Sequence, residues 1–111
     1  MDTYYNPADL AKFPDMAKDA PELGKAFFAY YGKVFQEGAL TAREKSLIAL
    51  AVAHAVQCPY CIDAYSSDAL EKGSNREQMT EAIHVAVAIR GGASLVHGVQ
   101  MRNTTGKISM E

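Results

Sequence analysis

Apolar residues recur along this chain three or four positions apart, which is the spacing of one face of a helix, and strand-like alternation is absent. After Pro21 the chain has only one more proline, Pro59, and alanines are spread over the whole sequence. Four helices are predicted, at about 21–37, 42–57, 59–72 and 75–103. The pattern therefore predicts an all-α fold.

The ends of these helices carry recognisable signals. Thr41 and Glu44 have the spacing of a capping box at the start of the second helix, and Ser74 and Glu77 have it at the start of the fourth. Glycines are placed to end the first and third helices, at Gly38 and Gly73.

Two of the predicted helices have unusual compositions. From Leu47 to Val56 the second helix is apolar almost all round, so we expect it to be buried on most sides. The fourth is expected to pause or bend at Gly91-Gly92, because each glycine weakens a helix by about 1 kcal/mol relative to alanine. Close approach of another helix would explain this pair, and the tail from Thr104 is predicted to be frayed.

The first twenty residues differ from the rest, because they hold Pro7 and Pro14 among mixed polar and apolar residues. Residues 1–20 are predicted to form an irregular arm with one short helical turn around 8–12. A chain of 111 residues and 12.0 kDa has room for one core. Residues 21–111 are therefore predicted to form a single helical domain.

Charge and hydropathy exclude several classes of partner. The chain has 11 basic and 13 acidic residues, a net charge of −2 and no basic run, so no nucleic-acid partner is expected. No stretch reaches the roughly 20 uninterrupted apolar residues of a membrane-spanning helix. The N-terminus lacks the pattern of a secretory signal. A cytoplasmic location without a membrane partner is expected.

Aromatic residues gather in the first helix on more than one face: Phe27, Phe28, Tyr30, Tyr31 and Phe35. Together with the nearly all-apolar second helix, they exceed what so small a domain is expected to cover by itself. A large exposed apolar patch usually marks an interface, so a homo-oligomer is expected. The alternative is that both faces of the first helix are used within one chain.

The candidate chemistry lies at Cys58-Pro59-Tyr60-Cys61, which holds both cysteines of the chain. With Pro59 as the first residue of a helix, Cys58 becomes its N-cap, where free N–H groups and the helix dipole lower a thiol pKa. Cys61 lies one turn later, within reach of a disulfide. Redox cycling, metal binding and two inert buried thiols all remain open.

Three further residues are candidates for the same site. His54 and Tyr65 lie four residues before Cys58 and four residues after Cys61, so each is expected on the same helical face as its cysteine. His54 would take or stabilise a proton and Tyr65 would orient the thiolate or a peroxide. Glu44 is a possible remote acid or base. The alternatives are a histidine bonded to a backbone carbonyl, an ordinary half-buried tyrosine and a capping-box acid.

No metal site or cofactor site is predicted. A zinc site needs four ligands, and the chain has one C-x-x-C pair without a second. His84 and His97, in the fourth helix, are interpreted as structural. No organic cofactor is implied.

The run from Leu40 to Cys61, with its Leu-Thr-x-Arg-Glu start, alanine-rich helix and C-x-x-C, resembles the core of the carboxymuconolactone decarboxylase superfamily. The C-x-x-C is similar to that of its alkylhydroperoxidase AhpD-like branch. The resemblance covers about residues 20–103. It implies an all-α trimer or hexamer that reduces hydroperoxides and is restored by a dithiol reductant protein. It also implies that Cys61 attacks the peroxide and Cys58 resolves, whereas the helix-start reasoning favours Cys58 as the thiol of lower pKa.

The chain departs from the family motif at two positions. Ser46 stands where the motif has a glutamate and Tyr65 where it has a histidine, while His54 is an additional histidine. A rearranged proton relay is expected. The segment 51–65 together with Arg90 to Ser94 also resembles a subgroup associated with arsenosugar biosynthesis.

Three function hypotheses follow from these residues. The first is a thiol-dependent peroxidase or disulfide oxidoreductase. The second is a protein that binds a soft metal or an arsenical through the same thiols without turnover. The third is a lyase like the superfamily's founding activity, which does not need a C-x-x-C.

Overall fold

The computed structural model describes residues 3–109, and within them it contains one 3-10 helix and five α-helices but no strand. The elements are η1 (Pro7–Ala17), α1 (Pro21–Val34), α2 (Ala42–Ala55), α3 (Pro59–Glu71), α4 (Arg76–Val96) and α5 (Gly98–Ser109). The prediction of an all-α fold is confirmed.

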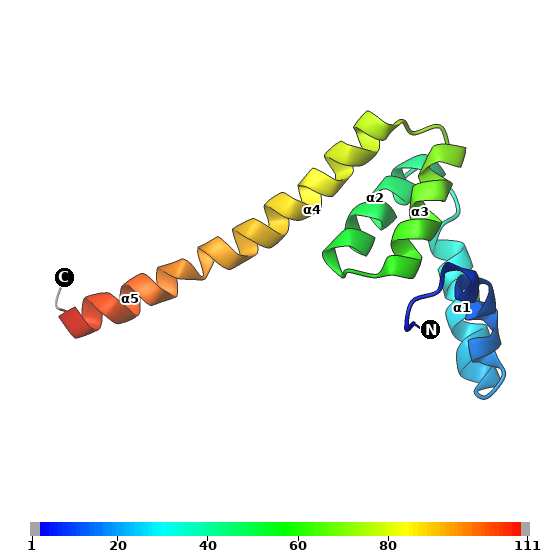
Figure 1. The fold of residues 1–111 in the computed structure, drawn as a ribbon, viewed down its shortest axis with the longest axis horizontal. Helices are drawn as coiled ribbons and strands as arrows, with labels where there is room; N and C mark the ends of the chain where they lie inside the picture. Colours follow the sequence, from blue (N-terminus) through cyan, green and yellow to red (C-terminus); the bar gives the residue numbers. More distant parts are fainter. Residues whose placement is uncertain (1–2, 110–111) are drawn as a thin grey trace.

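The core lies where α2 packs against α3 on one side and against the first half of α4 on the other (Figure 1). The fully or nearly fully buried residues of these helices are Ser46, Leu50, Ala53 and Ala69. The pair formed by η1 and α1 lies at one end of this core, and α5 continues α4 away from the opposite end. The guanidinium of Arg90 donates to the carbonyl of Ala55 and so ties α4 to the end of α2.

The start of α2 is the predicted capping box. The hydroxyl of Thr41 accepts the N–H of Glu44 at 3.0 Å, and the Glu44 carboxylate accepts the N–H of Thr41 at 2.8 Å. The box predicted for α4 is wrong by one residue, because Asn75 and Gln78 form it rather than Ser74 and Glu77. Ser74 is buried, with its N–H bonded to the Ala69 carbonyl at the end of α3.

A tight link joins α2 to α3. Gln57 has a left-handed backbone with φ of 57°, and its N–H bonds to the His54 carbonyl at 3.2 Å. The N–H of Cys58 bonds to the Ala53 carbonyl at 3.0 Å, which completes a Schellman motif. This motif ends α2 two residues before the predicted position 57 and turns the chain directly into α3.

The same motif ends α3, with Gly73 at φ of 92°. The N–H groups of Gly73 and Ser74 bond to the carbonyls of Leu70 and Ala69, at 3.0 and 2.9 Å. The prediction that Gly73 ends this helix is confirmed. Gly38 does not end α1, which stops at Val34 instead of residue 37.

The fourth predicted helix is wrong in its interruption and in its end. The helix α4 runs through Gly91 and Gly92 without a break, because glycine lowers helix propensity but keeps its backbone hydrogen bonds. A Cβ at either glycine would meet nothing within 4 Å in this chain. The interruption falls at His97, and α5 runs to Ser109, so residues 104–109 of the tail predicted to fray are helical, whereas residues 110 and 111 lie outside the described residues.

The N-terminal arm is more regular than predicted, because η1 covers 11 residues instead of one turn. It packs on α1 through the Phe13 ring, which meets Phe27 and Phe28 with centroids 6.2 and 5.0 Å away. A Cβ on Gly24 would lie 2.4 Å from the Cβ of Ala17, so only glycine permits this approach of η1 to α1.

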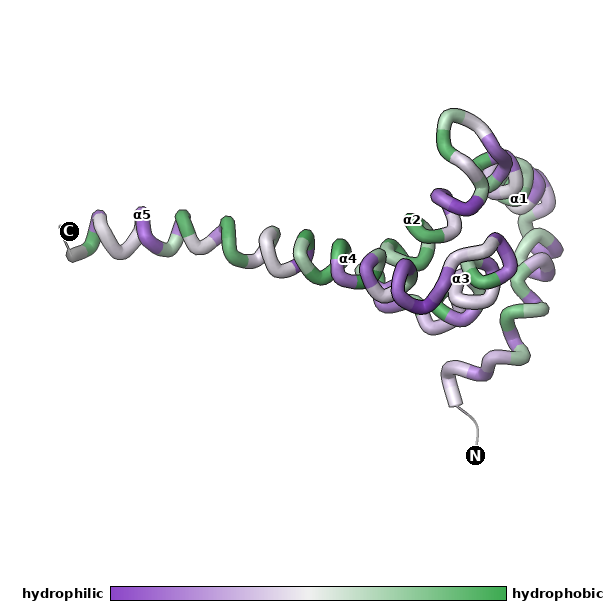
Figure 2. The backbone as a smooth tube through the Cα atoms, turned by 90° about the horizontal axis from the view of Figure 1, so that it is seen from above, coloured by the Kyte–Doolittle hydropathy of each residue, from purple (hydrophilic) through white to green (hydrophobic). Residues whose placement is uncertain are grey.

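Much apolar surface stays exposed outside the small core. On α2 the side chains of Ile48, Val52 and Val56 are about half exposed or more, so the expectation of a helix buried on most sides is wrong for this chain alone. The arm formed by α4 and α5 projects with apolar residues on successive turns (Figure 2). The radius of gyration is 19.3 Å, against about 13 Å for a compact domain of 100 residues.

The helical stretch Arg76–Ile108 is long and apolar enough to cross a membrane by length and composition alone. One such helix is weak evidence, because core helices pass the same test. The stretch is also interrupted by polar residues such as Arg90, which agrees with the absence of a long uninterrupted apolar run.

The two Schellman motifs allow a matched test of backbone strain. Gln57→Gly should raise the free energy of unfolding by about 0.5–1 kcal/mol, because glycine adopts the left-handed region without the Cβ clash. Gly73→Ala should lower it by about 1 kcal/mol for the converse reason. Urea unfolding followed by circular dichroism, at one chain concentration and with the disulfide intact, measures both. A lower midpoint for Gln57→Gly would contradict this account of the link.

Candidate functional site

Cys58 and Cys61 form a disulfide at the first turn of α3, with their Cα atoms 5.3 Å apart. Cys58 is the N-cap of this helix, and its Sγ accepts the N–H of Cys61 at 3.2 Å. The local geometry expected from the motif is thus present. Since a helix N-terminus favours negative charge, this position stabilises a thiolate at Cys58 whenever the disulfide is reduced.

Two cavities meet at this disulfide. The open cavity, of about 560 Å³, lies between α1 and α2 and is lined mainly by aliphatic and aromatic side chains. The second cavity, of about 340 Å³, lies between η1 and α3. Cys61 lines both cavities, whereas Cys58 lines only the second one. Cys61 is therefore the cysteine that lies next to both cavities.

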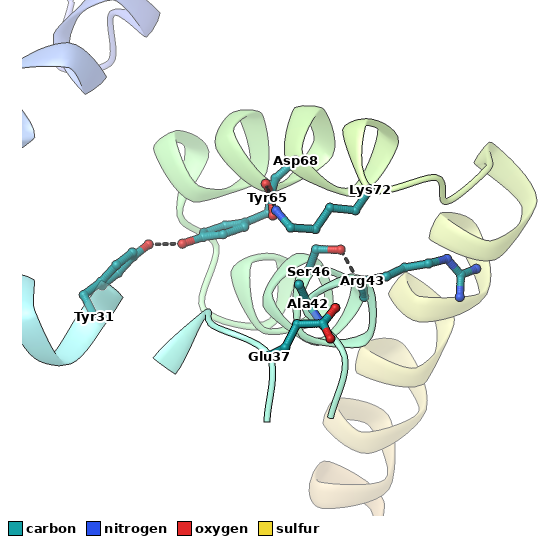
Figure 3. Close-up of polar contacts among 8 residues, drawn as sticks. All are labelled: Tyr31, Glu37, Ala42, Arg43, Ser46, Tyr65, Asp68 and Lys72. Atoms are coloured by element: carbon teal, nitrogen blue, oxygen red, sulfur yellow. Dashed lines mark hydrogen bonds and ion pairs between the residues drawn. The ribbon is translucent and has the colours of Figure 1, made fainter. Parts of the chain in front are cut away.

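Tyr65 lies four residues after Cys61, one turn farther along α3. Both residues line both cavities. Its hydroxyl is hydrogen-bonded to the hydroxyl of Tyr31, which reaches across from α1 (Figure 3). Its ring stacks on Phe35 with centroids 5.1 Å apart. Burial, followed by the hydrogen bond to Tyr31, raises the pKa of Tyr65 well above its usual value, so this phenol stays protonated at neutral pH.

The N-terminal segment is tied to α3 next to the cysteines. The Tyr5 hydroxyl donates to the Asp63 carboxylate, and this bond is the main cause that raises the pKa of Tyr5 to about 12. The ring of Tyr5 meets the edge of Tyr60 with centroids 4.9 Å apart, and the Tyr60 hydroxyl donates to the Tyr4 carbonyl at 3.4 Å. These contacts hold the segment before η1 beside the C-x-x-C motif.

His54 lies near the end of α2, half-buried, and lines neither of the two cavities. Its Nδ1 is 2.8 Å from the Leu50 carbonyl oxygen. A carbonyl can only accept, so Nδ1 carries the hydrogen and Nε2 is the basic nitrogen. This hydrogen bond is the structural alternative considered for this residue.

Ser46 stands at the glutamate position of the family motif, and Glu44 is the acidic residue nearest to it along the chain. Neither residue lines these cavities. Ser46 is fully buried and donates to the Arg43 carbonyl at 2.6 Å (Figure 3). Glu44 is exposed, and its carboxylate serves the capping box. The hydrogen bond from the Thr41 backbone holds the pKa of Glu44 below its usual value.

His84 and His97 are exposed on the α4–α5 arm and line neither cavity. In the described part of the chain, no group of three or more His, Cys, Asp or Glu side chains could hold a metal ion.

The model of the carboxymuconolactone decarboxylase family matches residues 21–101. The chain belongs to the carboxymuconolactone decarboxylase family. Members of this family are enzymes, decarboxylases or peroxidases, and are generally soluble. The resemblance found in the sequence is thereby confirmed at the level of the family.

Similar proteins support this membership. A protein of Paracoccus denitrificans described as uncharacterized protein 4 in the cox locus is 41% identical over 91 residues, which is 82% of each chain. An uncharacterized protein of Cupriavidus necator is 29% identical over 86 residues, 78% of this chain and 76% of that protein. Neither name states an activity.

Two solved structures have the same fold. A protein from Methanobacterium thermoautotrophicum aligns with a TM-score of 0.73 and 34% identity, over 78% of this chain and 97% of its own. An apo carboxymuconolactone decarboxylase family protein from Legionella pneumophila aligns with a TM-score of 0.64 and 37% identity, over 83% and 80%.

Sequence reasoning did not assign Tyr31 and Phe35 to the site. Both lie on the aromatic first helix, where they count toward its apolar face. The distance along the chain from Tyr31 to Tyr65 gives no local spacing that would relate them. The only signal was a tyrosine, with its polar hydroxyl, on a face otherwise made of apolar side chains.

The capping role of Glu44 predicts a definite pH dependence of stability. Its folded pKa is lowered below the ordinary value of 4.5, so its stabilising effect is present above that value and is lost as the pH falls through the folded pKa. Glu44→Ala should therefore lower the urea midpoint at pH 7, and the deficit should shrink at pH 3. Glu44→Gln is the control, since glutamine also forms capping boxes. A deficit that is constant from pH 7 to pH 3 would contradict the assignment.

Proposed function

We propose that the chain is a thiol-dependent peroxidase of the alkylhydroperoxidase AhpD-like branch, in which Cys58 and Cys61 cycle between dithiol and disulfide. The observation that carries the proposal is the disulfide at the N-terminus of α3, which lies in the walls of two cavities. Family membership supports it, since the family includes peroxidases of this kind. The Ser46 and Tyr65 departures make this a variant of that chemistry.

In the first step the Cys61 thiolate attacks the outer oxygen of the hydroperoxide. The O–O bond breaks, the sulfur is oxidised to a sulfenic acid, and the alkoxide leaves as an alcohol after taking one proton. Cys61 suits this role because it faces the open, largely apolar cavity, from which an organic hydroperoxide can approach. The Tyr65 hydroxyl, on the same wall, donates a hydrogen bond toward the departing oxygen.

In the second step the Cys58 thiolate attacks the Cys61 sulfenic acid, a disulfide forms, and hydroxide leaves as water. The N-cap position favours the thiolate of Cys58, which is the state that a resolving thiol needs. The thiolate favoured at Cys58 and the attacking role of Cys61 are therefore compatible. The same thiolate is also the better leaving group when the disulfide is reduced.

An external dithiol, on a reductant protein, completes the cycle. Its thiolate attacks Cys61 Sγ and expels the Cys58 thiolate, and its second thiol then releases Cys61 as a thiol. We assign His54 to proton transfer through Nε2 and Glu44 to a remote acid or base role. A cytoplasmic location, where such dithiols stay reduced, fits this chemistry.

The test is to treat the reduced protein anaerobically with a slight excess of cumene hydroperoxide and to follow it by mass spectrometry. Both thiols should be lost rapidly, with a mass decrease of about two hydrogens. Cys58→Ser should stop at a sulfenic acid on Cys61 that dimedone traps, because no resolving thiol remains. Cys61→Ser should lose rapid reaction altogether.

Thiols that survive peroxide for hours would sink the peroxidase proposal. Stoichiometric binding of arsenite to such thiols would then favour the soft-ligand alternative. The arsenosugar-associated resemblance supports an arsenical as that ligand. Glu44→Gln serves as a further check, because a real acid or base role should lower turnover while the cap is preserved.

We further propose that the chain acts as a homo-oligomer, a trimer or a hexamer, in which the exposed apolar surface is buried. This surface includes three exposed residues on the α4–α5 arm: Leu95, Val96 and Val99. The exposed residues Ile48 and Val52 on α2 also belong to it. Burying such residues against a second copy removes apolar area from water, which is the main driving force of association.

The double variant Leu95→Glu and Val99→Glu should lower the solution mass toward that of one 12.0 kDa chain, because charges desolvated in an apolar interface are costly. Thr104→Glu, exposed on a different face of α5 from Val99, is the matched control and should leave the mass unchanged. Light scattering coupled to size exclusion measures all three proteins. A wild-type mass equal to one chain would contradict the proposal.

A further inference from the structure

In the described part of the chain, three residues line both cavities: Tyr31, Cys61 and Tyr65. The two tyrosine hydroxyls are hydrogen-bonded to each other at this partition and point toward one another from α1 and α3 (Figure 3). Tyr31, Cys61 and Tyr65 thus lie together between the two cavities.

We propose that Tyr31 is a positioning residue, whose hydroxyl holds the Tyr65 hydroxyl so that Tyr65 donates its hydrogen toward the Cys61 sulfur. This inference rests on the proposed function, because the recipient is the Cys61 thiolate of the reduced enzyme. Tyr31 acts through Tyr65.

The direction of the hydrogen bonds follows from the inventory of a phenol, which has one hydrogen to donate and lone pairs that accept. In the disulfide form either tyrosine can be the donor. Once Cys61 is a thiolate, the arrangement in which Tyr31 donates to Tyr65 and Tyr65 donates to sulfur places a hydrogen on the negative charge. Charge-assisted bonds of this kind are stronger, and a chain of them is cooperative.

The aromatic packing keeps the Tyr31 hydroxyl in place. Its ring meets Phe35 with centroids 5.1 Å apart, Phe27 at 5.7 Å and Phe13 at 6.2 Å. Phe35 in turn stacks on Tyr65. Both rings are therefore held from several sides, so the hydroxyl pair needs little further ordering when the thiolate forms.

The charged side chains near Tyr31 and Tyr65 either have partners of their own or act on Tyr65 only through their charge. Lys45, on α2, donates to the Gln36 carbonyl at 2.6 Å. Lys12 and Asp9, on η1, pair with each other at 3.1 Å. Asp68, on α3, acts on Tyr65 only through its charge and favours the neutral phenol. Tyr31 is therefore the hydrogen-bonding partner that the described residues offer to Tyr65.

The experiment measures the rate at which iodoacetamide alkylates Cys61 between pH 5 and pH 10, in a Cys58→Ser background where Cys61 is the only thiol. Tyr31→Phe should slow the reaction at pH 7 by about three- to tenfold and move the pH midpoint upward, because the thiolate loses an oriented donor. The aromatic ring is retained, so the melting temperature should change little.

Two comparisons separate positioning from packing. Tyr65→Phe should have an effect of the same size, and the double variant Tyr31→Phe, Tyr65→Phe should be no slower than either single variant, because one chain of hydrogen bonds is broken once. Tyr30→Phe, an exposed neighbour on α1, is the matched control and should react like the parent.

Each outcome can be assigned. An unchanged pH midpoint in Tyr31→Phe, or additive effects in the double variant, would overturn the positioning role even if the wild type reduces peroxide. Alkylation does not require peroxide turnover. Suppose that Tyr31→Phe slows alkylation as expected but that the thiols of the wild type survive peroxide. This result would count against the proposed function and not against the hydrogen-bond chain.

Discussion

The three-residue link between α2 and α3, residues 56–58, is the constraint on which the rest of the structure depends. The backbone N–H of Cys58 closes the end of α2, and its sulfur accepts the first hydrogen bond of α3. Gln57, in its left-handed conformation, sets the direction of the reversal. One residue thus serves both helices, and the disulfide lies directly where α2 ends and α3 begins. The cavities on either side of Cys61 are therefore held in place by the same contacts that pack α2 on α3.

What the sequence could predict follows the range of each interaction. The capping box at Thr41 depends on a residue three positions later, and the N-cap at Cys58 follows from the adjacent Pro59, so both could be predicted from the local sequence. At the start of α4 both Ser74 and Asn75 are good caps, each with a suitable residue three positions later, so spacing could not choose between them. The N–H of Ser74 is already bonded to the Ala69 carbonyl at the end of α3, and Asn75 rather than Ser74 is the N-cap of α4.

Interactions between distant segments could not be predicted in this way. No local pattern relates Tyr31 to Tyr65, because helix periodicity shows which face is apolar and not which helix will cover it. The glycine pair in α4 gave a misleading signal for the same reason. Whether a glycine interrupts a helix depends on the surrounding packing as well as propensity, and here the backbone continues through both. The catalytic roles of His54, Tyr65 and Glu44 stay predictions, although the structure shows a hydrogen-bond partner for each of these side chains.

The sulfur cap of α3 links the redox state of the protein to the stability of a helix. A Cys58 thiolate is a stronger acceptor for the Cys61 N–H than a disulfide sulfur is, so the reduced chain has the better-capped α3. By thermodynamic linkage, whatever strengthens this cap in the reduced form also makes the disulfide more oxidising, by about 30 mV for each tenfold preference. Substitutions in the first turn of α3 that strengthen or weaken this cap would therefore shift the reduction potential without changing either cysteine.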